Sequence, residues 1–137
     1  MTTDLKGLIQ AYVEQIWNLA NLAALDDLTS PAFTYRLGGQ PGRDRAGMRQ
    51  FIEAIHRAFP DWRVQIIELV AEGNTVVIRW QGQVTHLGLF QGIPPTGKQI
   101  TVSGINIYHV LDGQIAAEWE QTDSLGMLMQ LGVLPSS

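Results

Sequence analysis

The chain has 137 residues, of which 45% are apolar and 16% are charged, and its net charge at pH 7 is −4. This length suits one domain, and the composition supports a hydrophobic core rather than disorder. The acidic balance argues against a nucleic-acid partner, and the absence of cysteine excludes disulfides, cysteine-bound zinc and thiol nucleophiles. We therefore expect a single domain over residues 1–137.

The first third of the chain predicts helices around one short strand. Apolar residues recur at spacings of three and four from Leu5 to Trp17, which predicts an amphipathic helix that Thr2 or Thr3 can cap. The following elements are expected to be a short helix over 22–28, a strand over 32–37, and a third helix over about 44–59. Pro60 ends that third helix.

The remainder is rich in β-strand patterns. Strands are expected over 61–73, 74–86, 99–110 and 114–123. Helices that precede antiparallel strands predict an α+β domain. A strongly curved antiparallel sheet with helices over one face can enclose an apolar pocket. Apolar residues on the other face of the sheet also need cover, which predicts a two-fold homodimer or a higher homo-oligomer.

The N-terminus gives the expected location. The stretch MTTDLKGLIQ carries an early acid and lacks a basic region followed by an apolar run, so no signal peptide is expected. No apolar run approaches the roughly 18 residues of a membrane span. We expect a cytoplasmic protein that does not associate with membranes.

Two strands place candidate site residues. In the strand that starts at Thr75, the even positions from Val76 onward share an apolar face, and His86 ends this row before a Gly/Pro-rich loop. His86 either serves a site or hydrogen-bonds that loop. In the last strand, Trp119 and Asp123 share a face by the same alternation.

The partner strand depends on the hairpin turn. A two-residue Asp-Gly turn would pair Val110 with Ile115 and put Asn106 on the side of Asp123. A three-residue turn with a bulge would pair Val110 with Gln114 and would put His109 there instead. We favour the three-residue turn, because the spacing of LDG fits it.

Asp123 stands between this strand and an apolar helical segment. It is either a carboxylate in an apolar pocket, and then a catalytic base, or the N-cap of the helix. The two roles are compatible.

Five stretches carry a family resemblance over nearly the whole chain. They are WNLANLAALDDL (17–28), FPDW (59–62), THLGLFQGIPPTGK (85–98), DGQI (112–115) and WEQTDSLGMLMQLGVLP (119–135). These stretches resemble the SnoaL-like polyketide cyclase and ester cyclase family, within the nuclear-transport-factor-two-like superfamily. The resemblance implies a cone-shaped α+β barrel with a deep apolar cavity.

The resemblance also implies an activity: cofactor-independent, metal-free intramolecular aldol closure of a polyketide-like substrate. The implied acid/base is Asp123, and His109 and His86 are its implied partners. The expected substrate-binding residues are Tyr12, Trp17, Phe33, Tyr35, Phe51, Trp80, Asn106 and Trp119.

The chemistry is reasonable for a buried carboxylate. A proton α to a ketone is moderately acidic, and an apolar pocket raises the pKa of a carboxyl so that it can remove that proton. Three rival interpretations remain: another enzyme of small apolar molecules (a hydrolase, isomerase or hydroxylase), a non-catalytic module that binds an apolar ligand, and a dimerising domain with a vestigial cavity.

Overall fold

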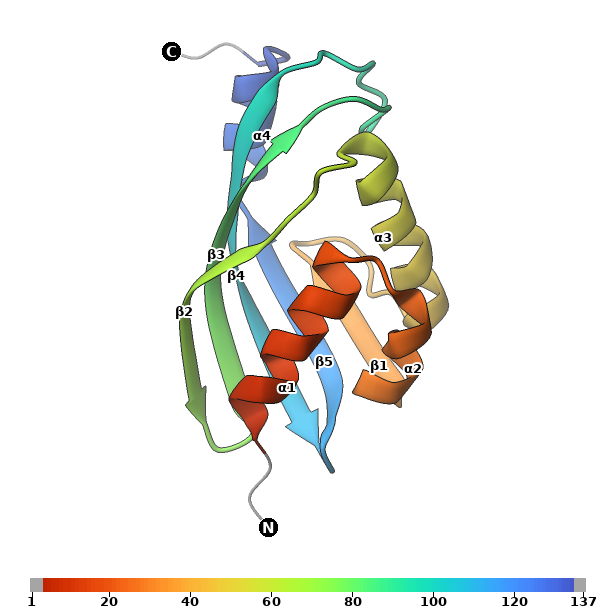
Figure 1. Ribbon diagram of the computed structural model, residues 1–137, viewed down its shortest axis with the longest axis vertical. Helices are drawn as coiled ribbons and strands as arrows, with labels where there is room; N and C mark the ends of the chain where they lie inside the picture. The colour runs from red at the N-terminus through yellow and green to blue at the C-terminus, as the bar shows by residue number, and fades with distance from the viewer. Residues whose placement is uncertain (1–3, 135–137) are drawn as a thin grey trace.

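Five strands form one curved sheet, and the helices between residues 5 and 58 cover one of its faces (Figure 1). The computed structural model describes residues 4–134. The helical segments are α1 (Leu5–Tyr12), the π-helical η1 (Val13–Asn18), the 3₁₀-helical η2 (Leu22–Ala24), α2 (Leu25–Leu28), α3 (Arg45–Ala58) and α4 (Ser124–Leu131). The strands are β1 (Thr29–Leu37), β2 (Gln65–Glu72), β3 (Thr75–Thr85), β4 (Gln99–Leu111) and β5 (Gln114–Thr122).

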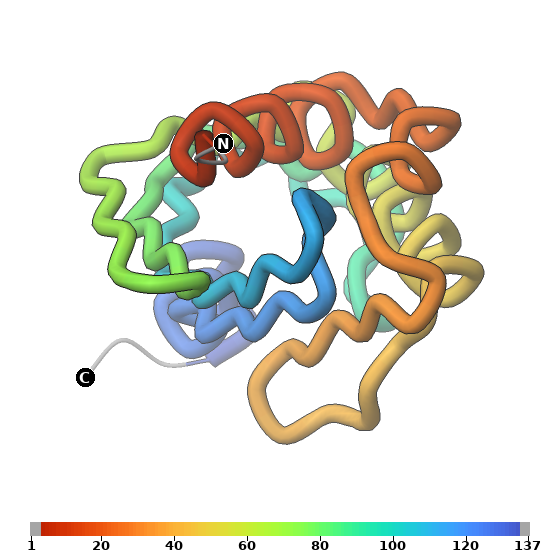
Figure 2. The backbone as a smooth tube through the Cα atoms, turned by 90° about the horizontal axis from the view of Figure 1, so that it is seen from below, coloured from red at the N-terminus to blue at the C-terminus, as the bar shows by residue number. Residues whose placement is uncertain are grey.

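The sheet is mixed but mainly antiparallel. Its strand order is β1-β5-β4-β3-β2, in which only the pair of β1 and β5 is parallel. Seen from below, α1 faces the hairpin of β4 and β5 from the opposite side of the molecule's interior (Figure 2). The predicted cone-shaped α+β fold is confirmed.

Three of the helices begin with the same local motif. An Asp at the N-cap accepts a hydrogen bond of 2.9 Å from the backbone N–H of a Gly three residues later. The pairs are Asp4 and Gly7 in α1, Asp44 and Gly47 in α3, and Asp123 and Gly126 in α4. The cap of the first helix is thus Asp4, whereas the predicted caps Thr2 and Thr3 lie outside the described residues.

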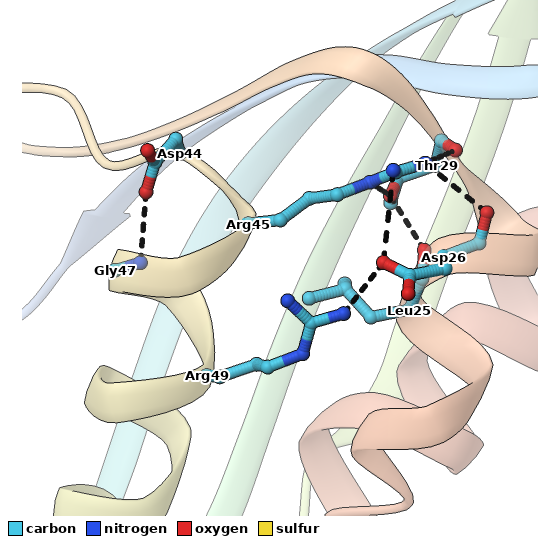
Figure 3. Close-up of polar contacts among 7 residues, drawn as sticks. All are labelled: Leu25, Asp26, Thr29, Asp44, Arg45, Gly47 and Arg49. Atoms are coloured by element: carbon cyan, nitrogen blue, oxygen red, sulfur yellow. Dashed lines mark hydrogen bonds and ion pairs between the residues drawn. The ribbon is translucent and has the colours of Figure 1, made fainter.

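Polar contacts fix α3 against α2 and the start of β1 (Figure 3). The guanidinium of Arg45 donates to the Thr29 hydroxyl over 3.0 Å and to the carbonyl oxygens of Asp26 and Thr29. Arg49 pairs with the Asp26 carboxylate. Because Thr29 is fully buried, this cluster holds the N-terminal half of α3 against α2 and the start of β1.

The core lies between the helices and the concave face of the sheet. The apolar patterns of the sequence predict a core of eight residues: Leu8, Tyr12, Ile16, Phe51, Ile55, Val76, Ile78 and Trp80. Six of them are buried: Tyr12, Ile16, Ile55, Val76, Ile78 and Trp80. Leu8 and Phe51 are half-buried and pack against this core. The predicted apolar row of β3 is confirmed as far as His86, which is also fully buried.

The favoured hairpin register is wrong. Val110 pairs with Ile115 and Leu111 with Gln114, so the turn has two residues, Asp112 and Gly113. Their φ angles are 52° and 77°, as a turn of type I′ requires.

The predicted faces of β5 are also wrong beyond Ile115. His109 pairs with Ala117 while Val110 pairs with Ile115, which leaves Ala116 as an unpaired bulge residue. The bulge shifts the alternation by one residue. Glu118 and Glu120 therefore face the core, and the following odd-numbered positions face outward.

The convex face of the sheet carries exposed apolar side chains. Val70, Ile105 and Ile107 are 60%, 48% and 38% exposed. The homodimer that would cover this face stays a prediction. None of the described helices is long and apolar enough to cross a membrane.

Candidate functional site

Two carboxylates of β5 lie inside the cone. Glu118 is fully buried and Glu120 is 5% exposed. Burying a carboxylate is costly unless hydrogen bonds compensate for lost water. Each of these groups has several such bonds, and their donors come from distant parts of the chain.

Glu118 accepts three hydrogen bonds. The Tyr12 hydroxyl from α1 donates to Oε1 over 2.6 Å, and the Trp17 indole N–H from η1 donates to Oε2 over 3.1 Å. The Asn106 amide from β4 donates to the same Oε2 over 2.8 Å. Helix and sheet therefore meet at this carboxylate.

Glu120 lies one pleat further along the strand. The Tyr35 hydroxyl from β1 donates to its Oε1 over 2.9 Å, and the Asn106 amide donates to the same atom over 3.2 Å. The Thr122 hydroxyl donates to its Oε2. All the donors come from strands, so the sheet alone fixes Glu120.

Asn106 bridges the two carboxylates. Its Nδ2 donates to both of them, and its Oδ1 accepts the Trp80 indole N–H over 2.8 Å. This last bond fixes which end of the amide faces the acids. The Glu120 carboxylate is close enough to Glu118 for its charge to raise the pKa of Glu118.

The burial of the pair changes its proton affinity. The pKa of Glu118 is raised from 4.5 to about 7, chiefly because burial disfavours the charged form. Glu120 adds to this rise, whereas the hydrogen bonds from Tyr12 and Asn106 oppose it. Burial also raises the pKa of Glu120, against the hydrogen bonds from Thr122, Tyr35 and Asn106 and the charge of Arg43. Raised carboxyl pKa values are typical of proton-transfer sites.

Glu120 is the acid that borders open space. A cavity of about 10 Å³ lies among η1, β3 and β4, and a second of about 30 Å³ lies among α3, α4 and the loop that carries Phe90. Glu120 lines both cavities, together with Trp17 and Trp62, whereas Glu118 lines neither. These volumes hold only a few waters, so an organic ligand requires the side chains at the second cavity to move outward.

The predicted placement of Asp123 in an interior pocket is wrong. Its side chain is exposed, and its Oδ1 accepts the Gly126 N–H as the cap of α4. At Gly126 a Cβ would lie 2.2 Å from the Asp123 carboxylate, so a larger residue there would displace the capping side chain. Asp123 borders an open depression on the outer face of the sheet.

His109 and Trp119 also lie outside the cone. Their rings are neighbours, with centroids 4.6 Å apart, and the guanidinium of Arg36 lies 5.7 Å from the Trp119 ring centroid. The prediction that they share a pocket with the acid is wrong, because the bulge at Ala116 turns Trp119 outward and the two-residue turn turns His109 outward with it.

His86 is buried and contacts the loop that follows β3. Its Nδ1 accepts the Thr96 backbone N–H over 3.2 Å and lies 3.0 Å from the Thr96 hydroxyl. Its ring packs beside Phe59 and Phe90, with centroids 5.5 and 6.4 Å away. The geometry matches the expected alternative in which His86 hydrogen-bonds the loop.

Most of the predicted substrate-binding residues surround the two acids. Tyr12, Trp17, Tyr35, Trp80 and Asn106 belong to the hydrogen-bond network, and Phe51 lines the second cavity. Phe33 packs beside Tyr12, with ring centroids 6.4 Å apart. Their binding role stays a prediction.

Sequence reasoning missed Glu118, Glu120 and Trp62. Alternation put the two acids on the face opposite Trp119 and Asp123, because Ala116 carries no sign of a bulge. One signal was present: Asn106 and Tyr108 are polar groups at alternate positions of the partner strand, and they needed partners on the same face.

Among residues 4–134, no group of three or more His, Asp or Glu side chains could hold a metal ion. The expectation of metal-free chemistry stays a prediction. The polar groups of the site are carboxylates, phenols, indoles and one amide, which are suited to holding and moving protons.

Comparison with known proteins agrees with this architecture. The model of the SnoaL-like polyketide cyclase family matches residues 7–131. A candidate polyketide cyclase from Acidithiobacillus ferrooxidans is 31% identical, with a TM-score of 0.84 over 96% of this chain and 98% of that one. No protein with a curated description matched the chain.

Two Streptomyces structures are also similar. IdmH, a candidate polyketide cyclase from Streptomyces antibioticus, is 29% identical, with a TM-score of 0.83 over 95% of this chain and 99% of that one. AclR, a candidate hydroxylase from Streptomyces galilaeus, is 26% identical, with a TM-score of 0.87 over 99% and 89%. The chain belongs to the SnoaL-like polyketide cyclase family.

Proposed function

We propose that this protein is an acid/base enzyme that closes a ring in a polyketide-like substrate by an intramolecular aldol reaction, with Glu120 as the base. One observation carries the proposal: Glu120 is a buried carboxylate with a raised pKa, and it lines both interior cavities. Family membership supports the substrate class.

The reaction needs one proton transfer in each direction. Glu120 removes a proton from the carbon next to a ketone, and the C–H electron pair forms the enolate. The enolate carbon then attacks a second carbonyl of the same chain, and the new alkoxide takes up a proton. The raised pKa of Glu120 makes its carboxylate a stronger base than an exposed one.

The groups around Glu120 position the carboxylate, set the charge beside it and fold the substrate. Tyr35 and Thr122 keep the carboxylate in place through their hydrogen bonds. Glu118, with a pKa of about 7, exists in both protonation states near neutral pH and adjusts the charge beside Glu120. The aromatic walls favour an apolar chain folded so that its two reacting carbons meet.

The test uses 2,6-heptanedione, a flexible diketone whose aldol closure gives 3-hydroxy-3-methylcyclohexanone, which then loses water to form the ultraviolet-absorbing 3-methylcyclohex-2-enone. Incubation in D₂O followed by NMR measures deuterium exchange next to the carbonyls, and ultraviolet absorbance measures ring closure. Glu120→Gln keeps the shape but not the base, so both rates should fall by about 10²- to 10⁴-fold.

Asp123→Asn is the matched control, because it also neutralises an acid while it keeps the capping oxygen. Its exchange rate should equal that of the wild type. A folded Glu120→Gln protein with wild-type exchange would exclude Glu120 as the base. Exchange without ring closure would leave proton transfer as the activity and exclude the aldol step for this diketone.

A further inference from the structure

Three tryptophans meet beside the acid pair. The ring centroid of Trp62 lies 6.5 Å from that of Trp17 and 6.2 Å from that of Trp80. Trp62 is 5% exposed and comes from the segment between α3 and β2. All three rings line the smaller cavity.

The three indole N–H groups are used differently. Trp17 donates to Glu118 and Trp80 donates to Asn106. Within residues 4–134, the Trp62 N–H is buried and has no hydrogen-bond partner. A buried tryptophan N–H usually has one, and an unmet donor costs free energy that a phenylalanine at this position would avoid.

Trp62 differs from the two other residues that have a buried side-chain nitrogen without a hydrogen-bond partner. Arg43 Nη1 and His86 Nε2 are also buried without a partner in the described part of the chain, but neither residue lines either of these two cavities. Trp62 lines both cavities, and so does Glu120. The unpartnered N–H therefore belongs to a residue that shares both cavities with the proposed base.

We propose that the Trp62 N–H binds the carbonyl oxygen of the ligand, next to the carbon that Glu120 deprotonates. The inference rests on the proposed function and adds a catalytic residue to it. An indole N–H donates only, so its partner must be an acceptor. The buried acids of the site disfavour a carboxylate ligand, and the aromatic walls favour a neutral ketone.

This contact strengthens during the reaction. When Glu120 takes the α-proton, the C–H electron pair becomes the carbon–carbon double bond, and the carbonyl π pair moves to the oxygen. The N–H of Trp62 then donates to an enolate oxygen, which is a stronger acceptor than the ketone. A donor fixed before the reaction stabilises that charge without reorganisation.

The test compares two ligands that differ by one oxygen. NMR titrations give dissociation constants for 2-tetralone and for tetralin with the wild type, Trp62→Phe and Trp119→Phe. Trp62→Phe should weaken 2-tetralone binding by about two- to tenfold, the range for one neutral hydrogen bond, and leave tetralin binding little changed. Trp119→Phe removes an indole N–H on the outer face and should change neither constant.

The outcomes separate this inference from the proposed function. Equal losses for both ligands in Trp62→Phe, or a wild type with no preference for the ketone, would reduce Trp62 to a packing residue. If Glu120→Gln kept wild-type exchange while Trp62→Phe lost the ketone preference, the base would be wrong and the oxygen subsite would stand. If Glu120→Gln lost exchange and Trp62→Phe kept the preference, only the subsite would be wrong.

Discussion

Glu120 and Asp123 are three residues apart, yet they lie in opposite environments. Glu120 is buried among strands and helices and accepts a hydrogen bond from Tyr35, which is 85 residues away in sequence. Asp123 is exposed, and its partner Gly126 is three residues away. A cap is thus a local property of the chain, whereas a buried acid is a property of the whole fold.

The comparison also explains why the two acids differ chemically. Water solvates the exposed Asp123 carboxylate. Glu120 and Glu118 lose that water, so burial raises the pKa of each. The same loss makes the pair costly for stability when it is charged.

The largest expected effect concerns Glu118 and the pH dependence of stability. Its pKa is about 7 in the folded protein and 4.5 as the ordinary value, so the folded state holds the proton more tightly. Its stabilising contribution is complete below pH 4.5 and is lost as the pH rises through about 7. The loss corresponds to about 3 kcal/mol.

Denaturant unfolding between pH 4.5 and 8 measures this effect. Glu118→Gln removes the titration, so its free energy of unfolding should fall less steeply over this interval than that of the wild type. The difference in slope is the relevant quantity, since glutamine also alters the bonds to Tyr12 and Trp17. Identical slopes would show that Glu118 does not titrate as its burial implies.

The sequence could predict the helices and strands better than it could predict which face of each strand points into the core. The alternation of β3 placed Val76, Ile78 and Trp80 correctly, because β3 pairs with β4 without interruption. In β5 one bulge at Ala116 inverted every later assignment. A small residue in a strand does not signal a bulge, and Ala116 is paired with neither neighbouring strand.

The N-cap of α4 could be predicted from the sequence, whereas the buried pair of Glu118 and Glu120 could not. The spacing of Asp and Gly at Asp123 also occurs at Asp4 and Asp44, where it begins two other helices. The network around Glu118 joins α1, η1, β4 and β5, so no stretch of sequence contains it. Predicting it requires the register first.

A smaller effect concerns the hydrogen bond that Tyr35 donates to Glu120. The hydrogen bond from Tyr35 lowers the pKa of Glu120, so Tyr35→Phe should raise that pKa further. The exchange reaction needs an ionised Glu120, and its acid limb should therefore move to higher pH. The buried carboxylate also loses a partner, at a cost of about 1–3 kcal/mol in stability.

A pH profile of deuterium exchange in 2,6-heptanedione measures this shift. Tyr12→Phe is the control, because it removes a hydrogen bond from Glu118 and leaves those of Glu120 in place. An unmoved acid limb in Tyr35→Phe would mean that Glu120 does not set the pH dependence.

The smallest effect belongs to the cap. Asp123→Ala removes the acceptor of the Gly126 N–H and should lower the free energy of unfolding by about 1 kcal/mol, whereas Asp123→Asn should cost little. Asp44→Ala removes the same type of cap from α3 and should cost a similar amount. Denaturant unfolding gives the stabilities, and exchange in 2,6-heptanedione should stay at the wild-type rate in both Asp123 variants. An Asp123→Asn protein that is fully stable yet as slow as Glu120→Gln would return the catalytic role to Asp123 and reverse the comparison between the two acids.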